Sequence, residues 1–342
     1  MKLFERVNNK QTYVIAEMSG NHAGSYEHAI EIVHAAALAG ADCLKIQTYT
    51  PDTLTLDCSK PEFLLQDGLW AGQRLYDLYG QATTPWEWHQ GIKDECEKLG
   101  MDFLSTPFDF SSTDFLEELD VELYKIASTE IVDLPLIEYV ASKGKPMIVS
   151  CGFANEEEIR DAVEAMERGG CKEYILLRCS AEYPAKPERM NLSLIPDMAQ
   201  RFGCRVGLSD HTMSNMSAIA AVAMGACVVE KHMCISRDIK NPDSEFSLEY
   251  AEFKELVRTI RETERAIGTP VYEGVDAGNH RFRSLFVVKD MKAGDEFTAE
   301  NVRSVRPGHG ISPKYYTQIL GAKAKKDISW ATPLTWDLVE KK

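Results

Sequence analysis

The chain is organised around the stretch RVGLSDHT, residues 205–212, in which a short apolar run gives way to polar side chains. A second stretch, residues 226–232, does the same and ends in Glu230-Lys231-His232. Because neutral imidazole is a good ligand for first-row divalent metals, His211 and His232 could together hold one ion. For either histidine alone, an ordinary hydrogen-bonded role is the simpler interpretation. The two histidines alone therefore do not establish a metal site, and further evidence must come from the other residues of the chain.

Both stretches fall within a regular alternation of short apolar runs and longer amphipathic segments. The predicted strands are residues 13–16, 43–47, 102–105, 123–127, 146–150, 174–179, 205–208 and 227–231. The predicted helices are residues 26–39, 86–99, 112–118, 134–143, 156–168, 192–202, 215–224 and 248–267. A glycine follows most of these helices, where a left-handed C-terminal cap favours it. Eight strand and helix units in strict alternation predict an α/β fold, the (β/α)₈ TIM barrel.

The chain of 342 residues is long enough for a barrel and one small further domain. We predict a catalytic barrel at residues 1–268, a linker at 269–283 and a mainly-β domain at 284–342. Such a small domain is only marginally stable alone, so it is expected to dock on something. Residues 48–84 form an unusually long connection, which is either a lid or specificity loop or packs on the barrel rim.

Composition excludes several classes of protein. The net charge of −15 argues against a nucleic-acid-binding surface. The first ten residues do not resemble a secretory signal, and no apolar run is long enough to span a bilayer, so we expect a cytoplasmic protein that does not enter membranes. The nine cysteines are scattered without a Cys-x-x-Cys pair, which favours small buried side chains over disulfides or a zinc knuckle.

Polar side chains are concentrated where the predicted strands end, which is where barrel enzymes place catalysis. They are Glu17, Lys45, Gln47, Thr106, Lys125, Ser128, Glu130, Ser150, Tyr183, Ser209, His211, Glu230 and His232. A barrel interior filled only for stability would carry valine, isoleucine and leucine there. Side chains alternate along a strand, so Asp210 should point away from Ser209 and His211, and its role stays open.

Two lysines, Lys45 and Lys125, lie in these strands and need either an anion or the loss of their charge when buried. They could cradle a phosphate and a carboxylate, and neighbouring hydroxyl groups would complete that site: Thr106, Ser128, Ser150 and Ser209. Alternatively, either lysine could be a Schiff-base nucleophile, whose pKa burial lowers. A third possibility is a structural ion pair with Glu17 or Glu230.

Six motifs occur in a fixed order: IAEMSGNH (15–22), KIQT (45–48), STPF (105–108), YKIAS (124–128), GLSDHT (207–212) and EKH (230–232). Together they resemble the bacterial sialic acid synthase family, which condenses phosphoenolpyruvate with an N-acetylated hexose. The segment containing VRPGHG (305–310) is similar to the antifreeze-like domain of that family, which has a SAF or β-clip fold. The resemblance covers nearly the whole chain.

Within this family, MSGNH (18–22) and the loop segments GLW (68–70) and LYDLY (75–79) are most similar to the subgroup that makes pseudaminic acid. The resemblance implies 2,4-diacetamido-2,4,6-trideoxy-L-altrose as the second substrate, joined by metal-assisted, aldol-type condensation with C–O cleavage and release of phosphate. Synthesis of N-acetylneuraminic (sialic) or legionaminic acid is the nearest alternative, and a class I Schiff-base aldolase is a further one. Ala181 stands where some sialic acid synthases have an asparagine, so that contact with phosphate is not expected.

The resemblance also implies a role for each strand-end residue. His211 and His232 would bind a divalent metal, Mn²⁺ first, with Mg²⁺ or Co²⁺ as alternatives. Glu17 or Glu230 would assist catalysis by activating water, and the sequence does not choose between them. Phosphoenolpyruvate would be bound by Lys45, Thr106, Lys125, Ser128, Ser150 and Ser209. The N-acetylated amino sugar would be contacted by Gln47, Glu130, Tyr183 and Asp243, with Arg306 contributed by the other subunit of a domain-swapped homodimer.

Overall fold

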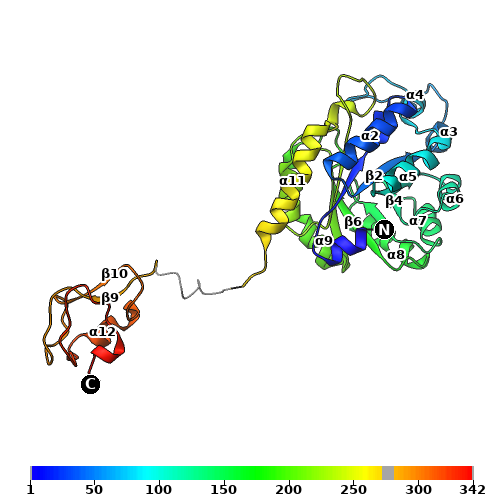
Figure 1. Ribbon diagram of the computed structural model, residues 1–342. Helices are drawn as coiled ribbons and strands as arrows, with labels where there is room; N and C mark the ends of the chain where they lie inside the picture. The colour runs from blue at the N-terminus through cyan, green and yellow to red at the C-terminus, as the bar shows by residue number, and fades with distance from the viewer. Residues whose placement is uncertain (1, 272–280, 341–342) are drawn as a thin grey trace. The chain divides into compact units, whose positions relative to one another are not determined.

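The computed structural model describes residues 2–271 and 281–340 and divides the chain into two compact units, Met1–Gly268 and Thr269–Lys342 (Figure 1). Most of the predicted linker, residues 269–283, falls on residues 272–280, which lie outside the described part of the chain. No helix among the described residues is both long enough and apolar enough to cross a membrane. Each unit is considered by itself below.

The first unit is built on eight parallel strands. They are β1 (Tyr13–Glu17), β2 (Cys43–Thr48), β3 (Asp102–Pro107), β4 (Tyr124–Ile126), β5 (Met147–Ser150), β6 (Tyr174–Cys179), β7 (Arg205–Asp210) and β8 (Val228–His232). Their order is β3-β2-β1-β8-β7-β6-β5-β4, with parallel pairing throughout. The strands at the two ends of this order, β3 and β4, contact each other and close the sheet. The predicted TIM barrel is therefore confirmed.

Eight main helices surround the strands: α2 (Tyr26–Ala39), α5 (His89–Lys98), α6 (Phe110–Glu118), α7 (Leu134–Ala141), α8 (Glu156–Arg168), α9 (Leu194–Phe202), α10 (Met216–Ala223) and α11 (Tyr250–Ile267). Local sequence defines several of their ends. The hydroxyl of Ser25 accepts a hydrogen bond from the backbone N–H of His28 at the start of α2, and Gly40 ends that helix with a φ of 91°. At α8, Asn155 and Glu158 form a reciprocal capping box.

A short helix that was not predicted, α1 (Leu3–Asn8), covers the amino ends of the strands. Leu3 is fully buried in the core inside the barrel together with Tyr13, Ile148 and Val228. The backbone N–H of Lys2 also donates to Asp102 at the start of β3, at 2.7 Å. Only a few apolar residues mark α1, too few to show a helical period. The helix closes one end of the barrel with apolar side chains and leaves polar chemistry to the other end.

The second unit is small and mainly β. Strands β9 (Ser284–Val287) and β10 (Val302–Val305) pair antiparallel, and isolated bridges such as Met291–Ile328 extend the sheet-like arrangement. A separate apolar core that includes Leu285, Phe297 and Ile319 holds the unit together. The helical pieces here are α12 (Tyr316–Ile319) and two single 3₁₀ turns, η6 (Pro313–Tyr315) and η7 (Trp336–Leu338).

If α1 seals the barrel, Leu3→Ala should lower the free energy of unfolding by about 2–5 kcal/mol, because a cavity replaces the buried side chain. Urea unfolding followed by far-UV circular dichroism measures this change. Leu38→Ala is the control, because Leu38 on α2 is 70% exposed and its truncation should change stability by no more than about 0.5 kcal/mol. Equal effects of the two substitutions would contradict a sealing role for α1.

Candidate active site

Strand register brings the polar residues of the sequence motifs together at the carboxyl ends of the strands. Glu17 on β1 is level with Lys45 on β2 and with His232 on β8. Ser209 on β7 is level with Glu230 on β8. All five side chains are buried. The barrel therefore assembles at one end the residues that the sequence carries on separate strands.

A row of alternating charge is formed by three of these side chains, Glu17, Lys45 and Glu230, together with Lys125 on β4. Lys45 Nζ lies 3.1 Å from Glu17 Oε2 and 2.9 Å from Glu230 Oε1. Lys125 Nζ lies 3.9 Å from the same Glu230 oxygen and donates to Ser150 Oγ at 2.7 Å and to the Ile126 carbonyl at 2.9 Å. This is the ion pairing that the sequence left open as one possibility. It holds Lys45 firmly between two carboxylates, whereas Lys125 has mainly neutral partners.

The two carboxylates differ in their protonation. Burial raises the pKa of Glu17 to about 7, although nearby Lys45 acts in the opposite direction. Burial acts the same way on Glu230, but Lys125 and Lys45 outweigh it and lower the pKa of Glu230 to about 2. Burial also lowers the pKa of Lys125 to about 8. Near neutral pH, Glu17 can therefore exchange a proton, while Glu230 remains ionised.

The histidine pair lies beside this row, with ring centroids 5.4 Å apart and an interplanar angle of 56°. His211 Nδ1 lies 2.9 Å from the Ser180 carbonyl oxygen, which can only accept, so Nδ1 carries a proton and Nε2 keeps a lone pair when the ring is neutral. Burial opposes the charged form of His211, but Cys179 and this carbonyl raise its pKa above the ordinary value. A cation bound at Nε2 would act against that shift.

His232 has a different environment. Burial, helped by His211 and Lys45, lowers its pKa well below the ordinary value, so the ring is neutral. Its Nδ1 is buried without a hydrogen-bond partner among the described residues. Two imidazoles with available lone pairs suit a divalent metal and leave coordination positions for water or substrate. The part of the chain described by the structure contains no group of three or more His, Cys, Asp or Glu side chains placed to hold a metal.

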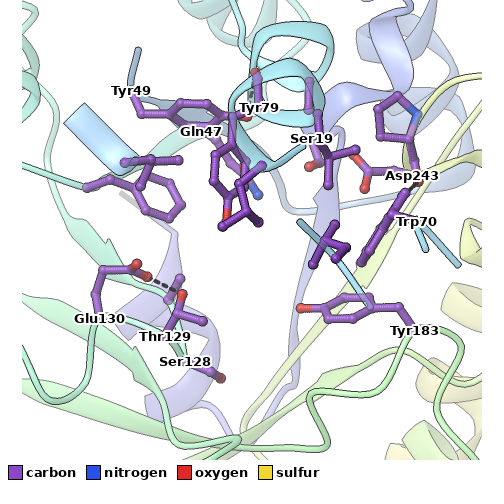
Figure 2. Close-up of a pocket in the computed structure, with 18 of the residues that line it drawn as sticks. Ser19, Gln47, Tyr49, Trp70, Tyr79, Ser128, Thr129, Glu130, Tyr183 and Asp243 are labelled. Atoms are coloured by element: carbon purple, nitrogen blue, oxygen red, sulfur yellow. Dashed lines mark hydrogen bonds between the residues drawn. The ribbon is translucent and has the colours of Figure 1, made fainter. Parts of the chain in front are cut away.

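His232 also contributes to the wall of a cavity of about 460 Å³ (Figure 2). The polar residues that line this cavity include Ser19, Gln47, Ser128, Thr129, Glu130, Tyr183 and Asp243. All four residues expected to contact a sugar from the barrel side are among them. Figure 2 shows Glu130 and Tyr183 on facing sides of the cavity. Ser19 belongs to the motif MSGNH but was given no role from the sequence, and Thr129 was not predicted.

The two carboxylates on the cavity wall, Glu130 and Asp243, are each held by a hydrogen bond. Thr129 donates its hydroxyl to Glu130 at 2.7 Å, and burial raises the pKa of Glu130. Asp243 Oδ2 accepts the backbone N–H of Gly20 at 2.7 Å, which ties the segment after β8 to the segment after β1. Carboxylates in such positions can accept hydrogen bonds from hydroxyl or amide groups of a bound molecule.

The long connection after β2 covers the cavity. It contains α3 (Pro51–Leu54) and α4 (Leu75–Ala82), and it lines the cavity with Tyr49, Leu54, Leu65, Trp70, Leu75, Leu78, Tyr79 and Ala82. The indole N–H of Trp70 donates to the Pro242 carbonyl at 2.9 Å, which fastens the connection to the segment that follows β8. The connection, called the lid below, therefore forms part of the cavity wall and is also attached to the barrel rim.

The remaining predicted site residues are distributed as follows. Thr106 Oγ1 is buried with no hydrogen-bond partner among the described residues. Ser128 Oγ accepts the backbone N–H of Gly152 at 3.0 Å, and Ser209 Oγ donates to Glu230 at 3.3 Å. Arg306 belongs to the second unit. Barrel residues of every predicted role therefore occur at one end of the barrel.

Asp210 and Lys231 form a buried ion pair on the outer side of the strands. Lys231 Nζ lies 2.6 Å from Asp210 Oδ2 and also donates to the carbonyl oxygens of Thr212 and Ser214, the first at 2.5 Å. The pair joins β7 to β8 and holds the loop that follows β7. Asp210, whose role the sequence left open, therefore helps to hold together the strands that carry His211 and His232.

Comparison with known proteins identifies relatives over most of the chain. The NeuB family profile matches residues 32–272, and the SAF domain profile matches residues 282–340. Pseudaminic acid synthase of Campylobacter jejuni is 42% identical over 329 residues, covering 95% of this chain and 96% of that protein. The enzyme of the same description from Helicobacter pylori is 40% identical over 332 residues, covering 96% and 98%.

Among solved structures, the N-acetylneuraminic acid synthetase of Leptospira borgpetersenii, determined with citrate, superposes with a TM-score of 0.70. The two sequences are 29% identical, and the match covers 78% of this chain and 88% of that one.

Removing the charge of Asp210 should destabilise the protein. Asp210→Asn leaves the Lys231 ammonium buried without a counter-charge, which typically costs about 3–5 kcal/mol of unfolding free energy. Chemical denaturation measures the cost. Asp197→Asn removes one of the two carboxylate partners of Arg201, in an exposed pair, and should leave stability unchanged. A mild effect at position 210, equal to that at 197, would show that the buried pair does not support the strand ends.

Proposed function

The chain belongs to the NeuB family, and from that premise we propose that it makes pseudaminic acid. The reaction joins phosphoenolpyruvate, 2,4-diacetamido-2,4,6-trideoxy-L-altrose and water and releases phosphate. The observation that carries this proposal is the identity of 42% and 40% to pseudaminic acid synthases over nearly the full length of both chains. The protein is thus a transferase that forms a C–C bond.

We assign phosphoenolpyruvate to the strand ends around Lys125. This lysine is buried, its closest partners are neutral, and its nearest carboxylate oxygen is 3.9 Å away. A phosphate or carboxylate of the substrate would compensate its charge and raise its pKa from about 8. Thr106 Oγ1, which has no partner among the described residues, is available to donate to the same anion. Lys45 and the hydroxyl groups of Ser128, Ser150 and Ser209 complete the proposed site.

The divalent metal, Mn²⁺ in the first instance, would be held by His211 and His232 and would polarise the aldehyde of the open-chain sugar. The lone pairs and burial of the two rings support this assignment. The ion-pair row described above keeps the neighbouring carboxylates engaged with lysines, so Glu17 and Glu230 are assigned other roles.

Of the two carboxylates, we assign proton transfer to Glu17. C3 of phosphoenolpyruvate bonds to the aldehyde carbon, whose oxygen gains a proton. Water adds at C2 and passes one proton to Glu17, which balances the proton gained by the sugar oxygen. The C2–O bond to phosphate then breaks with its electron pair leaving on phosphate, and the remaining proton of the added hydroxyl goes to that phosphate as the C2 carbonyl forms. Glu230 is less suited, because its oxygen Oε1 accepts from Lys45 at 2.9 Å and from Ser209 at 3.3 Å and its pKa is about 2. Its proposed role is to orient these two donors.

The sugar is proposed to occupy the cavity of about 460 Å³, with its polar groups toward Gln47, Glu130, Tyr183 and Asp243. Leucines of the lid, which are Leu54, Leu65, Leu75 and Leu78, supply an apolar wall on the other side. A 6-deoxy sugar with two acetamido groups carries three methyl groups that suit such a wall.

We also propose a domain-swapped homodimer in the cytoplasm, in which Arg306 of the second unit reaches the sugar bound to the partner's barrel. The charges support docking between the units of two chains. Residues 281–342 carry 12 Lys and Arg against 7 Asp and Glu, whereas residues 1–280 carry 26 against 46. Opposite net charges favour association of the small unit with a barrel.

One observation favours the alternative Schiff-base mechanism, namely the pKa of about 8 for Lys125, which is low for a lysine. However, Lys125 Nζ already donates to Ser150 Oγ and to the Ile126 carbonyl, and Lys125 is not among the residues that line the cavity. The group is therefore engaged as a hydrogen-bond donor, which favours binding of an anion over attack on a carbonyl carbon.

Phosphate release from phosphoenolpyruvate, measured with Mn²⁺ across a panel of sugars, tests the choice of substrate. We expect the highest kcat/KM with 2,4-diacetamido-2,4,6-trideoxy-L-altrose, because the apolar wall offers no partner for a 6-hydroxyl group. N-acetylmannosamine and the legionaminic acid precursor are the comparison substrates. Preference for N-acetylmannosamine would overturn the assignment in favour of sialic acid synthesis.

His211→Ala or His232→Ala should lower turnover by about 10³-fold or more, because loss of the metal removes several kcal/mol of transition-state stabilisation. Chelator treatment of the unaltered enzyme should have the same effect, and Mn²⁺ should restore activity. His34→Ala on α2, which alters a half-exposed histidine, is the matched control and should retain full activity. Activity that resists chelation, together with borohydride trapping of pyruvate on the protein, would instead establish the Schiff-base mechanism.

A further inference from the structure

The two histidines of the proposed metal site are held in place by different means. The ring of His211 is oriented by its hydrogen bond to the Ser180 carbonyl. For His232 the structure gives no hydrogen bond from either ring nitrogen to another described residue, and Nδ1 is buried without a partner. A metal-binding histidine usually has its second nitrogen fixed by a carbonyl or carboxylate, which sets the ring orientation. Something other than a hydrogen bond must orient His232.

Aromatic packing supplies the missing constraint, and Phe246 is its centre. The ring of Phe246 meets that of His232 edge-on, with centroids 4.9 Å apart and an interplanar angle of 74°. Phe246 also contacts Tyr183 at 5.0 Å and Trp70 at 6.1 Å. It is 1% exposed and lies behind the cavity wall, to which Trp70, Tyr183 and His232 all contribute.

Phe246 is itself rigidly placed. It ends a single 3₁₀ turn, η5 (Ser244–Phe246), which follows β8. The Ser247 hydroxyl closes this turn by donating to the Asp243 carbonyl at 2.6 Å, and Asn21 donates to the same hydroxyl at 2.8 Å. The turn is thus tied to the segment after β1. The Phe246 ring is held by its own backbone and surrounded by the rings of Trp70, Tyr183, His211 and His232, so it can keep an imidazole in one orientation.

We propose that Phe246 is a positioning residue of this enzyme, which orients His232 for metal binding in place of the usual hydrogen bond. The lid contributes to the arrangement, because Trp70 packs on the same phenylalanine ring and is fastened to the Pro242 carbonyl. This inference rests on the proposed function, since it takes His211 and His232 to be the metal ligands.

Calorimetric titration of the chelator-treated full-length protein with Mn²⁺, in the absence of both substrates, tests the proposal. Phe246→Leu and Phe246→Met keep an apolar side chain but remove the ring. Both should weaken Mn²⁺ binding by about 10-fold or more, the range seen when groups that orient a metal ligand are changed. Phe246→Met, whose side chain is flexible, serves if leucine is not tolerated. Binding as tight as in the unaltered protein would overturn the proposal.

Phe115→Leu is the matched control, because the ring of Phe115 also meets a histidine edge-on, with the centroid of His89 5.2 Å away and an angle of 84°. Unlike His232, His89 is fixed by hydrogen bonds to Thr48 Oγ1 at 2.8 Å and to the Pro85 carbonyl at 3.1 Å. We expect unchanged Mn²⁺ affinity in Phe115→Leu, although this substitution also removes a ring that packs against the core of the barrel. An equal loss of Mn²⁺ affinity in Phe246→Leu and Phe115→Leu would show that any loss of a core ring weakens binding, which would contradict the proposal.

His232→Ala separates this inference from the proposed function. If this variant binds Mn²⁺ as well as the unaltered protein, or if neither binds, the assignment of the metal site itself is wrong and the role of Phe246 fails with it. If His232→Ala abolishes binding while both Phe246 variants bind normally, the metal site stands and only the positioning role is refuted.

Discussion

The rest of the site depends on the position of Lys45 between Glu17 and Glu230, in the interior of a barrel where water cannot compensate charge. Burying these three groups separately would be prohibitively unfavourable, so they are stable only as a set. Lys125 then lies at the end of the row with its charge least compensated. The ion pairing that stabilises four buried charges therefore also leaves Lys125 as a favourable binding position for a substrate anion.

The remainder of the barrel is arranged so that this polar interior exists at one end only. Helix α1 places Leu3 among the apolar residues at the amino ends of the strands. The second buried ion pair, Asp210 with Lys231, faces outward and joins the two strands that carry the histidines. Over the cavity, the lid contributes leucines and Trp70 in place of charged residues. Inside the barrel, charge is therefore concentrated at the carboxyl ends of the strands, where the low polarity of the surroundings strengthens electrostatic contacts.

Within this one site, chemically identical side chains have different properties. The two carboxylates differ in protonation, and the two histidines differ in what orients their rings. Glu230 faces two lysines and stays ionised, while Glu17 faces one and has a pKa near 7. His211 is oriented by a backbone carbonyl, whereas His232 is surrounded by rings. In each pair the difference arises from neighbours contributed by other strands and loops. Divided roles are expected when identical residues have such different surroundings.

The sequence by itself determined the barrel, the eight strand positions and the small mainly-β unit, because hydrophobic period and helix caps are local properties of the chain. It also identified nearly every polar residue at the strand ends, since residues two apart on a strand share a face. Only the tertiary structure decided how these residues pair. It showed that Lys45 bridges Glu17 and Glu230, that Asp210 pairs with Lys231, and that Phe246 packs on His232. Helix α1 and the lid leucines lay beyond sequence reasoning for the same reason: their role depends on contacts with residues distant in the chain, and distances between strands leave no periodic signal in the sequence.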